Sequence, residues 1–191
     1  PRVSQLFRWQ KRGTELKGFV DSDFAGCRRT RKSTSGGGIF WGGHLLKHWS
    51  KTQAIIALSS GEAELGAVVK GSAEMLGLIS VLEDFGIAAT LELSSDSTAA
   101  IGMVKREGLG KVRHLHTADL WIQEKQKTGE VVHSKVNGKE NCADSLTKGV
   151  EAECIRKHFA YMSFTVISGR HELAPKLKEK EKKRKKPRSK K

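Results

Sequence analysis

The sequence predicts an α/β fold, and three features of its apolar patterns support this. Short runs of alternating apolar and polar residues come first, which is typical of strands in an antiparallel meander. One long helical pattern follows, and strand and helix patterns then alternate toward the end. A chain of 191 residues is long enough for one domain with a buried core and additional terminal segments.

The first predicted strand ends in two acids. Leu16, Phe19 and Val20 precede Asp21 and Asp23, and alternate side chains of a strand face the same side. The two carboxylates would therefore share a face, where they need either a cation or solvent. Because most aspartates are exposed, this stretch alone does not decide between a metal site and an ordinary strand end.

The segments on either side of this strand are basic. Residues 1–14 mix apolar and basic side chains, which predicts the end of a helix that stops at Gly13. Residues 27–38 predict a loop, because they include three consecutive glycines and a cluster of positive charges. Such a loop either contacts phosphates or is a solvated surface. Its charged residues are Arg28, Arg29, Arg31 and Lys32.

A hairpin and a long helix come next. Apolar residues on both sides of a double glycine predict two strands within 39–49, and 54–58 predicts a further short strand. Ser59 and Glu62 match a capping box, which predicts a helix that ends at Gly86.

Further acids lie at helix starts and strand ends. Glu62 and Glu64 lie in the first turns of the long helix, where the macrodipole alone explains one of them. Asp96 follows a predicted strand at 91–95 and is either a helix N-cap or a ligand. Asp144 lies in a predicted helix. The remaining predicted elements are helices at 97–106, 114–127, 141–147 and 151–163 and a strand at 131–136.

The positive charge is concentrated at the C-terminus. The net charge is +14, of which residues 176–191 contribute +9 and the rest of the chain +5. A mildly basic body fits a polyanionic partner such as nucleic acid, and it also fits simple solubility. The run 182–188 is typical of a nuclear-localisation or nucleic-acid-tethering segment, and equally of a solvated disordered end.

Cysteine usage and hydropathy bear on the cellular compartment and on membrane association. Cys27, Cys142 and Cys154 form neither a disulfide framework nor a C-x-x-C zinc motif, so we expect a reducing, intracellular compartment. No apolar run comes near the roughly 18 residues that span a bilayer, so we expect no membrane partner. Because the first residue is proline, we expect a piece of a longer polypeptide.

The order of these elements and acids resembles the ribonuclease H domain of Ty1/copia-type retrotransposon Pol polyproteins. Six phrases carry the resemblance: G-F-V-D-S-D-F-A-G, R-K-S-T-S-G-G, A-L-S-S-G-E-A-E-L, S-D-S-T-A-A-I, R-H-L-H-T-A-D-L-W and N-C-A-D-S-L-T-K. Matched position by position, the four acids of the family are Asp21, Glu64, Asp96 and Asp144. The chain departs from the usual pattern at His116, where an acid is usual.

The resemblance implies a ribonuclease-H-like fold, with a mixed five-stranded sheet flanked by helices. It implies hydrolysis of the RNA strand of an RNA–DNA hybrid with two divalent ions, Mg²⁺ or alternatively Mn²⁺. We assign residues 16–149 to this domain, 1–15 to the end of a reverse-transcriptase connection, 150–165 to a C-terminal helix and 166–191 to a basic disordered tail. The expected partners are the hybrid and the reverse transcriptase domain of the same polyprotein, in a cytoplasmic particle or the nucleus.

The four acids suit this chemistry, because two-metal cleavage needs hard oxygen ligands around ions about 3.5–4 Å apart. We expect Asp21 to bridge both ions, Glu64 and Asp96 to serve the leaving-group side, and Asp144 to help hold the ion that activates water. Asp23 is expected to be dispensable. The expected nucleic-acid contacts are Arg28, Arg29, Arg31, Lys32, Ser59 and Ser60, with His114 as an auxiliary residue.

Two other classes of function fit the same sequence. A catalytically silent remnant of such an element would bind hybrid or duplex without cutting it. A basic structural domain would make no catalytic use of its acids, and divalent ions would not stabilise it.

Overall fold

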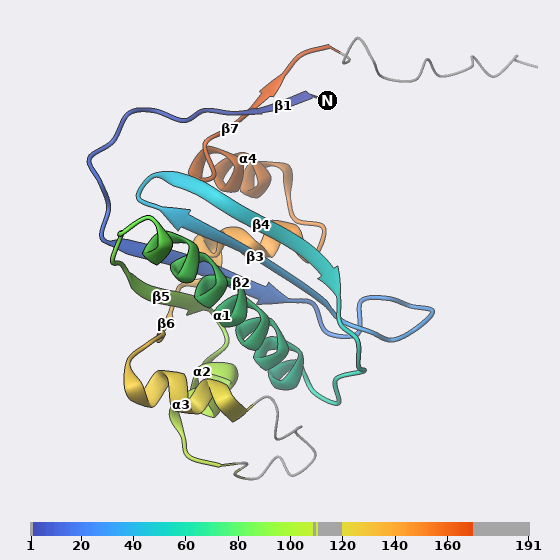
Figure 1. The fold of residues 1–191 in the computed structure, drawn as a ribbon. Helices are drawn as coiled ribbons and strands as arrows, with labels where there is room; N and C mark the ends of the chain where they lie inside the picture. The colour runs from blue at the N-terminus through green and yellow to red at the C-terminus, as the bar shows by residue number, and fades with distance from the viewer. Residues whose placement is uncertain (1, 109, 111–119, 170–191) are drawn as a thin grey trace, which may run out of the picture.

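The computed structural model describes residues 2–108, 110 and 120–169. Within them lie a five-stranded sheet with the strand order β4-β3-β2-β5-β6 and a two-stranded sheet of β1 and β7 (Figure 1). The strands of the larger sheet are β2 (Glu15–Ser22), β3 (Thr34–Trp41), β4 (His44–Thr52), β5 (Thr90–Ser95) and β6 (Val132–Lys135). The helices are α1 (Ser60–Asp84), α2 (Thr98–Lys105), α3 (Trp121–Thr128) and α4 (Ala152–Tyr161), with 3₁₀ helices η2 (Gly138–Glu140) and η3 (Cys142–Leu146).

The larger sheet is mixed, which confirms the predicted fold. β2 pairs antiparallel with β3, and β3 pairs antiparallel with β4. β5 lies on the other side of β2 and is parallel to it, and β6 is parallel to β5. β2 is therefore the central strand, between the antiparallel and the parallel halves.

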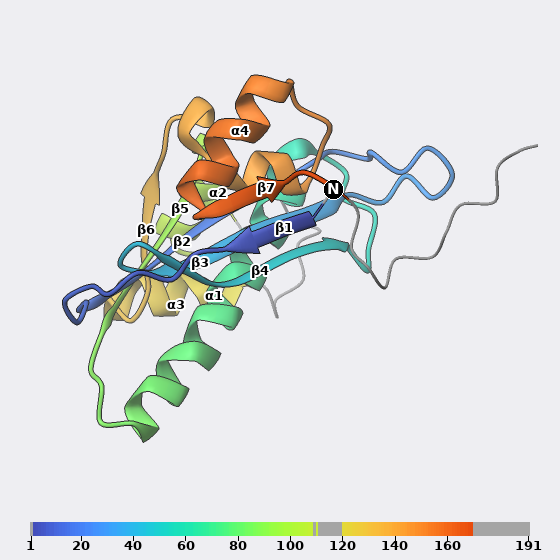
Figure 2. The same ribbon diagram turned by 90° about the horizontal axis from the view of Figure 1, so that it is seen from above.

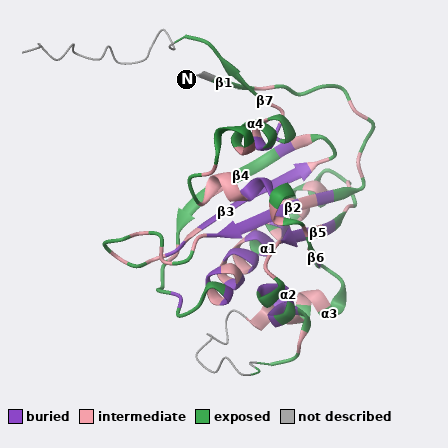
Figure 3. Cartoon of the chain, turned by 180° about the vertical axis from the view of Figure 1, so that it is seen from behind, coloured by how far each residue is buried: buried purple, intermediate pink, exposed green. Residues whose placement is uncertain are grey.

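The two faces of the sheet are covered by different helices. Leu16 and Val20 of β2 join a core with side chains of α1, α2 and α3. Phe19, which points the opposite way, joins a second core with η3 and Met162 at the end of α4. Figure 2 shows α1 and α4 on opposite sides of the sheet. β2 and β3 are mostly buried, whereas the edge strand β4 is mostly exposed (Figure 3).

The N-terminal prediction was wrong. Instead of ending a helix, the chain starts with strand β1 (Arg2–Gln5), which pairs antiparallel with β7 (Phe164–Ile167). The backbone N–H of Leu6 extends this pairing by donating to the carbonyl oxygen of Ser163 at 3.0 Å. The partner strand lies at the other end of the described chain, so no local pattern could reveal the pairing.

The glycines of the predicted loop 27–38 belong instead to strand β3. A Cβ atom at Gly36 would lie 2.7 Å from Thr147 Cγ2 and 2.8 Å from Leu146 Cβ. A Cβ atom at Gly37 would lie 2.2 Å from the ring of Trp49. These glycines therefore make room for neighbouring elements, and flexibility is not their role here.

Other predicted elements differ in length or type. The segment 54–58 is not a strand, and Ile55 and Ile56 are 53% and 52% exposed. The helix predicted at 141–147 is the short 3₁₀ helix η3. Of the predicted helix 114–127, α3 accounts for the part from Trp121, while 111–119 lie outside the described residues. The predicted disordered tail 166–191 is wrong at its start, because β7 (Phe164–Ile167) includes residues 166 and 167, and from residue 170 onward it lies outside the described residues.

Helix α1 begins where the capping box predicts. The Ser59 hydroxyl accepts a hydrogen bond from the backbone N–H of Glu62 at 3.2 Å, and Glu62 Oε2 accepts one from the N–H of Leu58 at 2.9 Å. By length and composition alone, α1 could cross a membrane, with a mean hydropathy of 1.5 over its most apolar window. Core helices of soluble proteins meet the same criteria of length and composition. In this structure α1 packs one face on the sheet.

We predict that Gly36→Ala destabilises the fold by about 1–3 kcal/mol, as overpacking typically does. The added methyl group would overlap Thr147 and Leu146, so η3 must move away from β3. Urea unfolding followed by circular dichroism measures the change. Gly77→Ala is the control, because a Cβ atom at Gly77 would have no neighbouring atom within 4 Å. Gly77 lies in α1, where alanine stabilises a helix by up to about 1 kcal/mol relative to glycine. Equal stability of the two variants would contradict the prediction.

Candidate metal centre

Three acids meet where two parallel strands end. Asp21 lies near the end of β2, and Asp96 directly follows the neighbouring parallel strand β5. Glu64 reaches the same place from the first turns of α1. One carboxylate oxygen from each residue lies within 4.8 Å of the others. The carboxyl ends of parallel strands share one edge of a sheet, so the topology brings these acids together.

The role of Asp96 at the start of α2 is resolved. Ser97 is the N-cap, because its hydroxyl accepts the backbone N–H of Ala100 at 3.2 Å. Asp96 is therefore available to the acid cluster. Asn141 holds it there, because the Asn141 side-chain amide lies 3.4 Å from Asp96 Oδ1 and donates to the carbonyl oxygen of Val20 at 2.9 Å.

Asp144 lies beside the cluster but is engaged by a lysine. Lys148 Nζ lies 2.5 Å from Asp144 Oδ1 and 4.0 Å from Asp21 Oδ2. The Thr147 hydroxyl donates a hydrogen bond to Asp21 Oδ2. The structure thus groups Asp21, Glu64 and Asp96, and it places the fourth predicted acid next to them in an ion pair.

Burial and like charges raise the proton affinity of the cluster. The pKa of Asp21 is raised, because burial outweighs the hydrogen bond from Thr147 and the charge of Lys148, and nearby acids add to the rise. The pKa of Glu64 is raised to about 8 by burial, and next by the charges of Asp21 and Asp96. Glu64 Oε2 is buried without a hydrogen-bond partner. A divalent cation would relieve these costs.

Lys148 is held in its charged form. Burial alone would lower its pKa, but the contact with Asp144 and the charge of Asp21 raise it above its usual value. The charged ammonium group therefore partly offsets the negative charge of Asp144 and Asp21 in the metal-free protein.

Two polar residues that support the site were missed by the sequence analysis. Asn141 is fully buried, and its side-chain oxygen also accepts the N–H of Ala143, so it ties η3 to β2. Its position just before Ala143 and Asp144 is a cap pattern that could have identified it. Gln53 donates from Nε2 to the carbonyl oxygen of Ala63 at 2.7 Å, one residue before Glu64. No sequence motif marks Gln53.

Asp23 has a different role from Asp21. Asp23 directly follows β2, and its backbone N–H still donates to the carbonyl oxygen of Thr34 at 3.1 Å. The prediction that its carboxylate shares the face of Asp21 is wrong, because that carboxylate bonds the backbone of Thr34. Its Oδ1 accepts a hydrogen bond from the backbone N–H of Thr34. A Cβ atom at Gly26 would lie 1.8 Å from the Asp23 carboxylate, so the loop folds tightly around this side chain. Asp23 therefore shapes the base of the loop that carries the predicted phosphate contacts.

The predicted nucleic-acid residues are largely on the surface. Arg28, Arg29 and Arg31 are exposed and Lys32 is half-buried. Ser59 is occupied as the cap of α1, and Ser60 is exposed. The predicted auxiliary residue His114 lies outside the described residues, as does His116.

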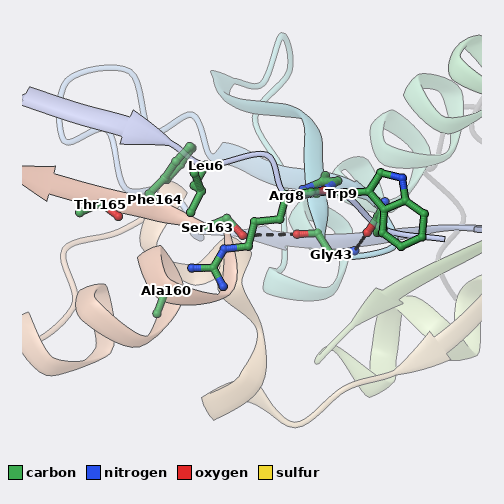
Figure 4. A pocket seen from close by; sticks show the side chains of 10 residues that line it. Leu6, Arg8, Trp9, Gly43, Ala160, Ser163, Phe164 and Thr165 are labelled. Carbon is green, nitrogen blue, oxygen red and sulfur yellow. Dashed lines mark hydrogen bonds between the residues drawn. The ribbon is translucent and has the colours of Figure 1, made fainter. Parts of the chain in front are cut away.

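A separate pocket lies at the opposite end of the sheet. Gly43, which lines the pocket, lies two residues after Trp41, and Trp41 pairs with Leu16 near the start of β2. Asp21 lies near the other end of that strand. Figure 4 shows the pocket between the segment after β1 and the start of β7. It is lined by Leu6, Arg8, Trp9, Gln10, Gly43, His44, Ala160, Ser163, Phe164 and Thr165. This pocket is not part of the acid cluster.

We predict that Glu64 lowers the stability of the metal-free protein progressively as pH rises from about 4.5 to about 8, against an opposite contribution below about 6.5 from buried His133, whose pKa is lowered to about 4. Unfolded Glu64 loses its proton near 4.5, whereas the folded side chain retains it up to about 8. At Glu64 the folded state therefore binds more protons in this range, and the contribution of this side chain to the free energy of unfolding falls with rising pH. Melting temperatures in EDTA measure the slope. Glu64→Gln should make the slope more positive and raise the melting temperature more at about pH 8 than at about pH 5; an unchanged slope would contradict this assignment.

No family model matches the chain. Its sequence is similar to a retrovirus-related Pol polyprotein from transposon TNT 1-94 of Nicotiana tabacum, with 33% identity over 137 residues, 71% of this chain and 10% of that protein. It is also similar to one from transposon RE1 of Arabidopsis thaliana, with 28% identity over 136 residues, 70% of this chain and 9% of that protein. The chain thus spans about a tenth of the length of these relatives.

A solved structure shares the fold. LC11-RNase H1, in complex with an RNA/DNA hybrid, is 17% identical, has a TM-score of 0.50 and covers 70% of this chain and 94% of its own. At this identity the likeness shows the fold alone. Sequence and fold agree: the chain is a ribonuclease-H-like domain related to the retrovirus-related Pol polyproteins of copia-type transposons.

Proposed function

We propose that this chain is a metal-dependent nuclease that hydrolyses the RNA strand of RNA–DNA hybrids. The observation that carries the proposal is the convergence of Asp21, Glu64 and Asp96 at the ends of β2 and β5. The similar solved structure is in complex with an RNA/DNA hybrid, which supports the choice of substrate.

The residues present fit a divalent metal. Carboxylate oxygens are the hard ligands that Mg²⁺ prefers, and Mn²⁺ accepts the same set. The partnerless buried Glu64 Oε2 also suits a cation. Asp21, Glu64 and Asp96 would hold one ion, and Asp21 and Asp144 a second. When bound, such ions activate the attacking water and stabilise the leaving oxygen.

The residues of this chain orient the ligands. Thr147 fixes one oxygen of Asp21, and Asn141 fixes Asp96 relative to β2. Burial of Asp21 restricts its side chain further. Asp21 and Asp96 therefore need little rearrangement to present their oxygens, which reduces the cost of reaching the reactive geometry.

The basic loop supplies the substrate contacts in this proposal. Arg28, Arg29 and Arg31 are exposed near the end of β2, where they can neutralise phosphates. Contacts to phosphates and 2′-hydroxyl groups carry little base specificity, so we expect cleavage of hybrids of many sequences. The relatives are polyproteins, which supports action of this domain together with a reverse transcriptase domain of the same chain.

Asp96→Asn tests the proposal with a labelled RNA–DNA hybrid and Mg²⁺ or Mn²⁺. Changes in the shell around metal ligands cost about 10–100-fold, so loss of a ligand should cost more than that. Asp23→Asn is the matched control, because it makes the same chemical change two residues from Asp21 and an amide oxygen can still accept from Thr34. The control should retain cleavage. If the unmodified protein cuts no faster than Asp96→Asn while binding hybrid, the silent remnant is the correct class.

Removal of charge from the loop should weaken binding and leave the metal site intact. We predict that Arg28→Ala combined with Arg29→Ala raises the Kd for hybrid and lowers its salt slope by about 1 for each lost phosphate contact, equally for all sequences. Fluorescence anisotropy over a salt series measures both. Lys157→Ala, on exposed α4, is the control. Unchanged affinity in the double variant would exclude the loop as a phosphate contact.

A further inference from the structure

Lys148 occupies a position between two of the acids. Its Nζ lies 2.5 Å from Asp144 Oδ1 and 4.0 Å from Asp21 Oδ2. Asp21 and Asp144 are the pair that would hold the second ion under the proposed function. The ammonium group of Lys148 therefore contacts the same Asp144 carboxylate that would bind the second divalent cation.

The backbone that carries Lys148 is fixed, but its side chain is not. The backbone N–H groups of Thr147 and Lys148 both donate to the carbonyl oxygen of Asp144 at 3.3 Å, and Thr147 also bonds Asp21 through its hydroxyl. η3, just before them, packs on Gly36. The Lys148 side chain, in contrast, is 48% exposed, so its flexible stem can turn to solvent.

The electrostatics favour exchange over coexistence. Without a cation, Asp21 and Asp144 repel each other, and Lys148 offsets this repulsion. Once a divalent ion binds Asp144, the ammonium group and the ion repel each other at short distance, where solvent screens their charges less than in bulk water. Asp144 therefore has one positive partner at a time.

We propose that Lys148 is the resident counter-ion of Asp144 and competes with the second metal ion for that carboxylate. The inference rests on the proposed two-metal function. It follows that the site of Asp21, Glu64 and Asp96 fills first, and that the ion at Asp144 binds more weakly because Lys148 must leave. Lys148 is thus a positioning residue that sets the affinity of the second ion.

Lys148→Met tests this, because methionine retains much of the stem and removes the charge. Calorimetric titration of the full chain with Mn²⁺, without nucleic acid, should show two binding steps, and the variant should bind the second ion at least about tenfold more tightly. In EDTA, its melting temperature should be below that of the unmodified protein, and Mn²⁺ should raise it by more. Lys148→Arg, which keeps the charge, should retain the weak second step.

Lys157→Met is the matched control, since Lys157 forms the same i,i+4 pair with Glu153, at 3.3 Å, but on α4. It should leave the Mn²⁺ titration unchanged. If Lys148→Met does the same while the unmodified protein binds two ions and cleaves hybrid, the inference is wrong and the proposed function stands. If the variant has an unchanged titration but a higher Kd for hybrid, Lys148 is a phosphate contact instead. If the unmodified protein binds no Mn²⁺, both proposals fail.

Discussion

The candidate site depends on the close approach of η3 to the central sheet. Asp21 on β2 is paired in register with Gly36 on β3. Because Gly36 has no side chain, Thr147 and Leu146 pack directly on the strand beside Asp21. This one contact brings η3, with Asp144, and Lys148 just beyond it to a sheet whose other half supplies Asp96. A larger residue at 36 would separate the two parts of the site.

The acid cluster opposes the stability of the fold that holds it. Asp21 and Glu64 are largely removed from solvent and repel each other, and the raised pKa values of both express that cost. The protein offsets part of it with the hydroxyl of Thr147 and the ammonium group of Lys148. A cluster of buried acids whose negative charge is only partly compensated is typical of functional sites, which often lower the stability of the fold.

Two aspartates separated by one residue have different structural tasks. Asp21 is the last acid held within β2, where it is buried and faces the cluster. Asp23 lies beyond the strand and accepts the backbone N–H of Thr34, so it closes the base of the basic loop. The D-S-D sequence therefore joins the candidate metal centre to the candidate nucleic-acid surface, and the end of the strand separates the two roles.

The sequence by itself determined the features that depend on local chemistry. Periodicity located β2, the β3–β4 hairpin and α1, and the capping box located the start of α1. The six phrases of the family resemblance predicted the fold and the three acids that meet. The tertiary structure decided what depends on contacts between distant segments. These are the pairing of β1 with β7, the burial of Gly36 under η3, the bonds of Asn141, and the ion pair of Asp144 with Lys148 beside the group of three acids. Such contacts depend on how separate elements pack, and no periodicity or local propensity along the chain encodes that geometry.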